Sequence, residues 1–354
     1  MRSVKVKFVG FWQGFNPDDF LMFQLMKKHY DVCICEDPDY VICSCFGWNE
    51  CLKYDQVRIM FSGENYIPDF NHMDYGVSVY PVRFQDRHFS FPGMVGINHG
   101  ILTVLAQKDR NYSQEIFSGK SCFANIVTSH ESENGIRGEL FRALNAYKRV
   151  ESGGTYLNNM PGGIPVWGKE KTELQKKCKF TICPESTVHR GFITEKIFDA
   201  FYADTIPIYC GSPTAFEIIN KGAYLDVNDF DSVEDLVKRI IELDTNDEKY
   251  LEMLRQPVFV QQNYVEDKIR EFEMFITNIF DQPLEKAYRR SRVYMPKRVE
   301  DQIVRSVQIE KDFDNGQFRS KTWISQQIAI KIKEKLTAVL KRNHNSSPKM
   351  GEKK

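Results

Sequence analysis

The sequence lacks any apolar run of the length needed to cross a membrane, so it predicts no membrane-spanning helix. It also lacks an apolar segment near Met1, where residues 1–8 lead directly into a predicted strand, so we expect no signal peptide. Repeats and low-complexity tracts are absent as well, and an apolar share of 42% excludes a mainly disordered chain. The 354 residues favour globular domains with full cores, and the length allows two of ordinary size.

Net charge is also missing, because 48 Lys and Arg residues balance 48 Asp and Glu residues. A general attraction to nucleic acid is therefore not expected. The balance conceals an asymmetry, since residues 284–354 carry 18 basic and 8 acidic side chains and the rest of the chain is correspondingly acidic. A basic tail on an acidic body indicates an acidic surface as the target of the tail.

The nine cysteines lack the even number and the spacing of a secreted disulfide framework. Cys33 and Cys35, like Cys43 and Cys45, stand two residues apart in predicted strands, so each pair would share one face. A zinc site is one interpretation of these pairs. Small core side chains in a reducing compartment are the favoured one, and no cluster has convincing metal-ligand spacing. The sequence therefore predicts no metal site.

Residues 178–212 form the segment around which the chain is organised. Residues 180–183 are typical of a buried strand, residues 184–191 cannot continue it, and residues 206–209 resume a strand. Thr194 is a candidate N-cap for the helix between the two strands. The pattern predicts a β-α-β unit, whose loop lies at the carboxyl edge of a parallel sheet, where open α/β folds bind ligands.

The predicted loop and the first turn of the helix collect charged groups. Glu185, Glu195 and Lys196 all fall there, together with the unpaired N–H groups and the positive dipole end of the helix. Lys196 adds a full positive charge. The combination favours an anion as ligand, most simply a phosphate.

The same segment carries a resemblance to a known family. From Glu185 the chain reads EST-x-H-xx-FITEK, and from Ile206 it reads IPIY-x-GS. Both blocks, at this spacing, resemble the donor-binding signature of the α-1,3/1,4-fucosyltransferases (glycosyltransferase family 10), most of all the bacterial Lewis-antigen enzymes. The resemblance extends over residues 55–280 and is thinner before residue 55.

Alternating strands and helices predict an α/β fold with mainly parallel sheets. The resemblance implies the GT-B arrangement, in which two Rossmann-like domains face each other across a cleft, with a basic helical tail added here. The expected segments are an N-terminal acceptor-side domain (residues 1–118), a GDP-fucose-binding domain (residues 119–261), a helix returning to the first domain (residues 262–284), and the tail (residues 285–354).

The resemblance implies an inverting fucosyltransferase that moves L-fucose from GDP-fucose to a GlcNAc-containing acceptor glycan, with an α-1,3 linkage expected. Glu64, which directly follows a predicted strand, matches the family's general base. Arg137 and Lys196 match the residues that hold the diphosphate as its negative charge grows. Glu195 matches a glutamate placed against the ribose and the fucose, and we count it with Glu64 as catalytic.

Glu185, Ser186 and Phe192 complete the predicted donor side. Family members usually have Asn where Ser186 stands and Tyr where Phe192 stands, which removes polar contacts to the nucleotide. Two alternatives stay open, namely a GT-B transferase with another nucleotide sugar and a non-catalytic carbohydrate-binding relative. No cofactor is expected besides the donor substrate, and stimulation by Mn2+ is left open.

Residues 322–341 predict a helix with isoleucines and leucines at four-residue spacing and lysines around them. This pattern is typical of helices that lie on anionic membranes. A helix packed on the body of the protein, or a dimer helix, remains an alternative. The basic amphipathic pattern, together with the expected absence of a signal peptide and of a spanning helix, leads us to expect an enzyme on the cytosolic face of a bacterial inner membrane. Its acceptor is expected to be a glycan that can be lipid-linked. The oligomeric state is left open.

Overall fold

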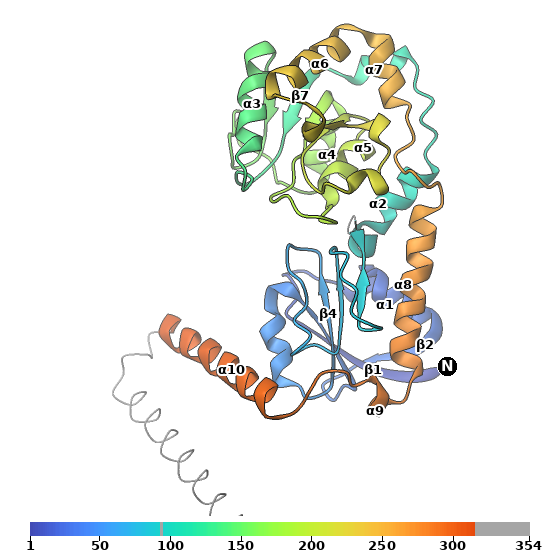
Figure 1. Ribbon diagram of the computed structural model, residues 1–354, viewed down its shortest axis with the longest axis vertical. Helices are drawn as coiled ribbons and strands as arrows, with labels where there is room; N and C mark the ends of the chain where they lie inside the picture. Colours follow the sequence, from blue (N-terminus) through green and yellow to red (C-terminus); the bar gives the residue numbers. More distant parts are fainter. Residues whose placement is uncertain (93–94, 316–354) are drawn as a thin grey trace, which may run out of the picture. The chain divides into compact units, whose positions relative to one another are not determined.

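The computed structural model describes residues 1–92 and 95–315 (Figure 1). Two sheets form its framework, and every strand pair in both is parallel. The strand order is β2-β1-β3-β4-β5-β6 in the first sheet and β11-β10-β9-β7-β8 in the second. The predicted α/β fold with parallel sheets is therefore confirmed. Both sheets belong to one compact unit, residues 1–290, and a second unit begins at Ser291.

The strands are short and follow the predicted segments closely where the sequence is strongly apolar. In chain order they are β1 (Arg2–Val9), β2 (Tyr30–Ile34), β3 (Tyr40–Ser44), β4 (Val57–Ser62), β5 (Tyr75–Ser78), β6 (His88–Ser90), β7 (Cys122–Ile126), β8 (Val150–Ser152), β9 (Cys178–Ile182), β10 (Ile206–Tyr209) and β11 (Leu225–Asp226).

Helices α1 to α5 lie between strands in the chain, and helices α6 to α10 follow the last strand. The α-helices are α1 (Leu21–His29), α2 (Val95–Gln107), α3 (Ile136–Tyr147), α4 (Lys169–Lys176), α5 (Glu195–Tyr202), α6 (Val233–Thr245), α7 (Asp247–Leu254), α8 (Tyr264–Asp281), α9 (Leu284–Ala287) and α10 (Tyr294–Asp314). The 3-10 segments are η1 (Pro17–Asp19), η2 (Cys45–Lys53), η4 (Gln114–Gly119), η5 (Ala215–Glu217), η6 (Lys221–Ala223) and η7 (Val227–Asp229).

The sequence of residues 4–12 predicts the first strand, which begins and ends earlier in the structure. The apolar pattern extends to residue 12, but β1 ends at Val9 because Gly10 has a φ of 66°. A Cβ atom at Gly10 would lie 2.2 Å from the carbonyl oxygen of Gly47. The close approach of two backbones, which only glycine permits, ends the strand and brings the start of η2 against it.

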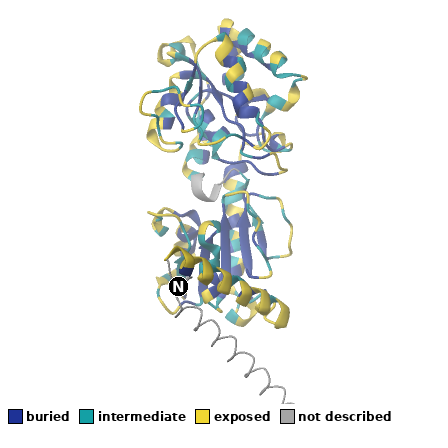
Figure 2. Cartoon of the chain, turned by 90° about the vertical axis from the view of Figure 1, so that its left-hand side faces the viewer, coloured by how far each residue is buried: buried dark blue, intermediate teal, exposed yellow. Residues whose placement is uncertain are grey.

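The core of the first sheet continues into the helices beside it. Strands β3, β4 and β5 are buried along their whole length, as the dark blue strands of Figure 2 show. Helix α8 runs alongside this sheet (Figure 1), where the Phe272 ring lies 5.2 Å from that of Phe89 and 4.8 Å from that of Phe91. The same apolar cluster includes Ile197 and Phe201 of α5, so the two sheets share part of one core.

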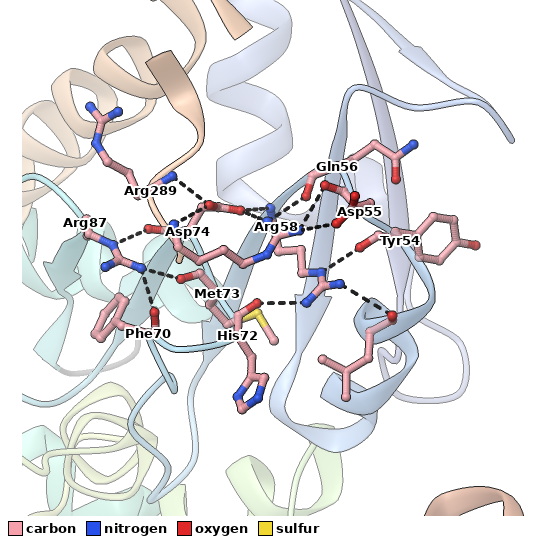
Figure 3. A network of polar contacts seen from close by, with 12 residues as sticks. Tyr54, Asp55, Gln56, Arg58, Phe70, His72, Met73, Asp74, Arg87 and Arg289 are labelled. Atoms are coloured by element: carbon pink, nitrogen blue, oxygen red, sulfur yellow. Dashed lines mark hydrogen bonds and ion pairs between the residues drawn. The ribbon is translucent and has the colours of Figure 1, made fainter. Parts of the chain in front are cut away.

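A buried polar network fastens the end of the first unit to its sheet. Figure 3 shows Asp74, at the start of β5, between Arg58 and the main chain of Arg289. The Asp74 carboxylate is fully buried and accepts N–H groups from Arg58 (2.8 Å), Arg289 (2.7 Å) and Arg290 (2.8 Å). It also forms an ion pair with the Arg290 guanidinium. Residues 289–290 are therefore part of the first fold.

The predicted amphipathic helix at 322–341 lies outside the described residues. The tail is described as far as residue 315 and consists mainly of α10, most of which is exposed in Figure 2. Within residues 1–92 and 95–315, none of the helices combines the length and the hydropathy that a membrane crossing requires.

Candidate functional site

The central β-α-β unit forms as predicted. Strand β9 pairs in parallel with β10, with Phe180 opposite Ile206 and Ile182 opposite Ile208, and α5 connects them. The connection between β9 and α5 therefore starts at the carboxyl end of β9. In parallel sheets this is the edge at which ligands bind.

Glu185 supports this loop from inside. Its side chain is buried, with Oε1 2.7 Å from the backbone N of Thr194 and Oε2 2.7 Å from Thr194 Oγ1. Thr194 is the N-cap residue of α5, as predicted, but its hydroxyl makes no capping bond. The hydroxyl instead donates to the Glu185 carboxylate and accepts a hydrogen bond from Lys196 Nζ.

Lys196 lies in the first turn of α5 between two carboxylates. Its Nζ is 3.2 Å from Glu185 Oε2, 3.3 Å from Glu195 Oε1 and 2.8 Å from Thr194 Oγ1. Burial is the largest influence on the pKa of Lys196 and lowers it, but the two carboxylates outweigh burial and raise the pKa above its usual value. Lys196 therefore remains positively charged at the helix start.

Glu195 keeps its negative charge for the matching reason. Burial tends to raise the pKa of Glu195, whereas the ammonium groups of Lys196 and Lys171 lower it, and the net result is a lowered pKa. The lowered pKa favours the carboxylate form of Glu195, which can only accept hydrogen bonds.

Arg137 is more deeply placed than a surface arginine. Its side chain is buried near the start of α3, and its guanidinium donates to the carbonyl oxygens of Pro184 (2.9 Å) and His130 (2.8 Å). These bonds join the loop after β7 to the loop after β9. A small pocket at the ends of these strands is lined by Arg137, Lys196 and Lys171.

Lys171 is a member of this pocket that the sequence did not indicate. It lies on α4, is buried, and its Nζ is 2.8 Å from Asp199 Oδ2. In the sequence it stands in a lysine-rich run typical of an exposed helix face. Nothing local distinguishes it, since only the packing of α4 against β9 and α5 turns it inward.

Ser186 and Phe192, the two departures from the family pattern, have different surroundings. Ser186 is half-buried, and its carbonyl oxygen accepts the N–H of Glu133 at 2.8 Å. Phe192 is buried and stacks on Tyr80, with ring centroids 5.9 Å apart and an interplanar angle of 20°. Tyr80, which the sequence also did not indicate, donates its hydroxyl to Asn65 Oδ1.

Glu64 lies beyond the end of β4 and is exposed. Its backbone carbonyl accepts the N–H of Tyr66 at 2.7 Å, which makes a tight turn. Across residues 1–92 and 95–315 its carboxylate has no hydrogen bond or ion pair. It borders a pocket of about 410 Å³.

The turn after β4, which carries Glu64, is linked through Tyr80 to the loop that leads into α5 and Lys196. Asn65, next to Glu64, holds Tyr80, and Tyr80 stacks on Phe192 of the loop before α5. Beside this stack Gly191, with a φ of 78°, approaches Pro81 so closely that a Cβ atom would lie 2.3 Å from Pro81 Cδ. The structure therefore joins the Glu64 turn of the first sheet to the Lys196 loop of the second.

Two family models match successive parts of the chain. One is described as the N-terminal domain of the alpha-(1,3)-fucosyltransferase FucT and matches residues 6–95. The other is described as the C-terminal part of glycosyltransferase family 10 (fucosyltransferase) and matches residues 117–273. The chain belongs to glycosyltransferase family 10. The predicted family membership is confirmed.

Family 10 relatives resemble the chain over parts of their length. The alpha-(1,3)-fucosyltransferase FucT of Helicobacter pylori is 25% identical over 288 residues, which are 71% of this chain and 59% of that protein. The 4-galactosyl-N-acetylglucosaminide 3-alpha-L-fucosyltransferase 9 of Mus musculus is 30% identical over 115 residues, 32% of this chain and 30% of that protein. The chain thus spans less than two thirds of the length of these family 10 members.

Solved structures give the same fold. A crystal structure of an alpha1,3-fucosyltransferase superposes with a TM-score of 0.65 at 22% identity, covering 83% of this chain and 93% of that one. A second, with GDP-fucose, gives a TM-score of 0.63 at 23% identity, covering 80% and 93%. At these identities the similarity establishes the fold of this family 10 chain. In the part of the chain that the structure describes, no three His, Cys, Asp or Glu residues form a metal-binding group.

Proposed function

We propose that the protein transfers L-fucose from GDP-fucose to a GlcNAc-containing glycan, with inversion at the fucose anomeric carbon and an α-1,3 linkage. The observation that carries this proposal is the clustering of three cations, Arg137, Lys171 and Lys196, around a cavity of about 20 Å³ at the carboxyl edge of the second sheet of a family 10 chain. The relatives support it, because the Helicobacter pylori protein that the chain resembles is an alpha-(1,3)-fucosyltransferase.

Lys196 and Arg137 hold the diphosphate in this mechanism. Bond cleavage leaves negative charge on the departing GDP, and fixed cations aimed at that charge lower the barrier most when water is excluded. Lys196 is already held in place by Glu185 and Thr194, so little reorganisation accompanies the reaction. Glu195 faces the ribose and fucose hydroxyls, while Ser186 and Phe192 border the nucleotide.

Glu64 acts as the general base in this proposal. An exposed carboxylate beside a pocket can accept the proton of an acceptor hydroxyl as the new glycosidic bond forms. Its link through Asn65 and Tyr80 to the loop before α5 supports a base that works together with the donor site. The residues divide as in the GT-B arrangement, with acceptor-side residues 1–118 and donor-side residues 119–261 across a cleft, and residues 262–284 returning to the first domain.

The proposal includes the setting of the reaction. GDP-fucose is the donor, no metal is required, and the acceptor is a glycan that can be lipid-linked. The basic sequence of residues 285–354, above all 322–341, holds the enzyme at the anionic cytosolic face of the bacterial inner membrane. Sedimentation with anionic vesicles at low salt tests this part. Equal binding by the full chain and by a chain ending at Arg290 would contradict it.

The test of the proposed function is a GDP-release assay with GDP-fucose and N-acetyllactosamine, followed by linkage analysis of the product. We expect acceptor-dependent GDP release, a fucosylated product, and thermal stabilisation by GDP but not by UDP. Stabilisation by UDP alone, together with no release from GDP-fucose on a panel of N-acetyllactosamine and Lewis-precursor acceptors, would contradict the proposal.

A further inference from the structure

The pocket beside Glu64 has a composition that differs from that of the donor site. It measures about 410 Å³, which lies within the range of small-molecule sites. Its lining includes the aromatic side chains of Trp12, Phe46 and Trp167, and among the described residues that line it Glu64 alone is charged. No lysine or arginine of residues 1–92 and 95–315 lines it, so these residues offer no cation to a diphosphate.

The three aromatic side chains are unusually exposed for their size. The exposed fractions are 39% for Trp12, 63% for Phe46 and 76% for Trp167. Large apolar side chains that gather in an exposed, concave place mark a binding surface more often than a defect. They come from three separate segments, two beside the first sheet and one before α4 in the second.

Neighbouring aromatic rings hold two of these three side chains, Trp12 and Phe46, in place. The Trp12 ring lies 5.1 Å from that of Phe15 and 5.7 Å from that of Phe11, and both contacts are edge-to-face. Phe11 and Phe15 are themselves stacked at 3.9 Å against the core. The Phe46 ring stands at 82° to that of Trp12, with centroids 6.2 Å apart. Trp12 and Phe46 therefore line the pocket with two nearly perpendicular rings.

A sugar ring fits this chemistry. A pyranose has faces of C–H groups that pack on aromatic rings and an edge of hydroxyls that needs polar partners. The aromatic rings offer the first kind of contact, and Gln13 and Glu64 in the same lining offer the second. An uncharged, hydroxyl-bearing ligand is favoured over a nucleotide, because the single carboxylate would repel phosphate groups.

We propose that Trp12, Phe46 and Trp167 form the subsite for the acceptor sugar and hold the reacting hydroxyl toward Glu64. The inference rests on the proposed function and adds the residues that select the acceptor. Because Trp167 belongs to the donor-side segment while Trp12 and Phe46 belong to the acceptor side, the sugar would be held from both.

The experiment compares Trp167→Ala and Phe46→Ala with a control, Phe216→Ala, whose ring is 47% exposed and does not line the pocket. The readouts are the KM for N-acetyllactosamine, the KM for GDP-fucose, and the slow hydrolysis of GDP-fucose by water without acceptor. We expect each pocket variant to raise the acceptor KM about tenfold, as loss of an aromatic contact would, with the donor readouts unchanged. The control should match the wild type.

Binding is measured separately, from the tryptophan emission of the wild-type protein with GDP as N-acetyllactosamine is added. We expect a saturable change that is reduced in Trp167→Phe. Fucose transfer with an unchanged acceptor KM in both pocket variants would overturn the subsite. A loss of GDP-fucose hydrolysis in these variants as large as their loss of transfer would overturn it too. A saturable emission change without any fucose transfer would retain the subsite and refute the proposed function instead.

Discussion

Replacing Asp74 by asparagine tests whether the buried network of Figure 3 stabilises the first sheet. Asparagine keeps the shape of the side chain, removes its charge, and turns one acceptor oxygen into a donor. Asp74 is fully buried and receives three backbone N–H groups, and its ion-pair partner Arg290 has a side chain only 2% exposed. The substitution therefore removes the buried charge opposite the Arg290 guanidinium and leaves it Asp55, a carboxylate whose side chain is 83% exposed.

The expected loss follows from this burial. Breaking one member of a buried ion pair typically costs about 3–5 kcal/mol, and we expect Asp74→Asn to lower the free energy of unfolding by that amount. The control is Asp86→Asn, because Asp86 pairs with Arg289 at the surface, with side chains 39% and 25% exposed. Such a pair contributes about 0–1 kcal/mol. Urea unfolding followed by tryptophan emission measures both variants. A loss for Asp74→Asn no larger than that of the control would show that the buried pair does not stabilise the first sheet.

Further predictions concern the end of the first unit, the donor site and the need for a metal. A chain ending at Arg290 should unfold at the same urea concentration as the full chain. A chain ending at Pro283 should be destabilised, because it loses the backbone N–H groups of Arg289 and Arg290 that bind Asp74. Equal urea midpoints for the two shortened chains would argue against this. Lys196→Met should weaken GDP binding in calorimetry by roughly 10–100-fold, the value of a charge-assisted hydrogen bond, while the exposed Lys169→Met should not. Transfer activity should persist in EDTA, and a complete loss that manganese restores would show a metal requirement.

Much of the fold was predictable because local chemistry and tertiary structure agree. Ser232 and Asn246 are residue types that favour helix N-caps, and both side chains accept the N–H of the residue three positions on, Asp235 (3.2 Å) and Lys249 (3.0 Å). The apolar run at 206–209 became β10 without change. Such segments carry their own signals.

Other parts depend on contacts with distant segments. The stretch from 76 to 118 shows no clear period, because it holds the three-residue strand β6 and helix α2, which packs on both α5 and α8. In the site, Glu64, Arg137 and Lys196 were indicated by spacing that resembles the family. Lys171 and Tyr80 were missed, since only folding places them beside α5 and Phe192.

The proposed function makes this chain a fucosyltransferase with Glu64 as its general base. The most direct measurement is the transfer rate of Glu64→Gln with GDP-fucose and N-acetyllactosamine, compared with its GDP affinity in calorimetry. Loss of a general base costs roughly 10²–10⁴-fold in rate. We predict a loss of that size with GDP affinity unchanged, because Glu64 lies outside the cation-lined pocket. A transfer rate within about threefold of the wild type would contradict the assignment.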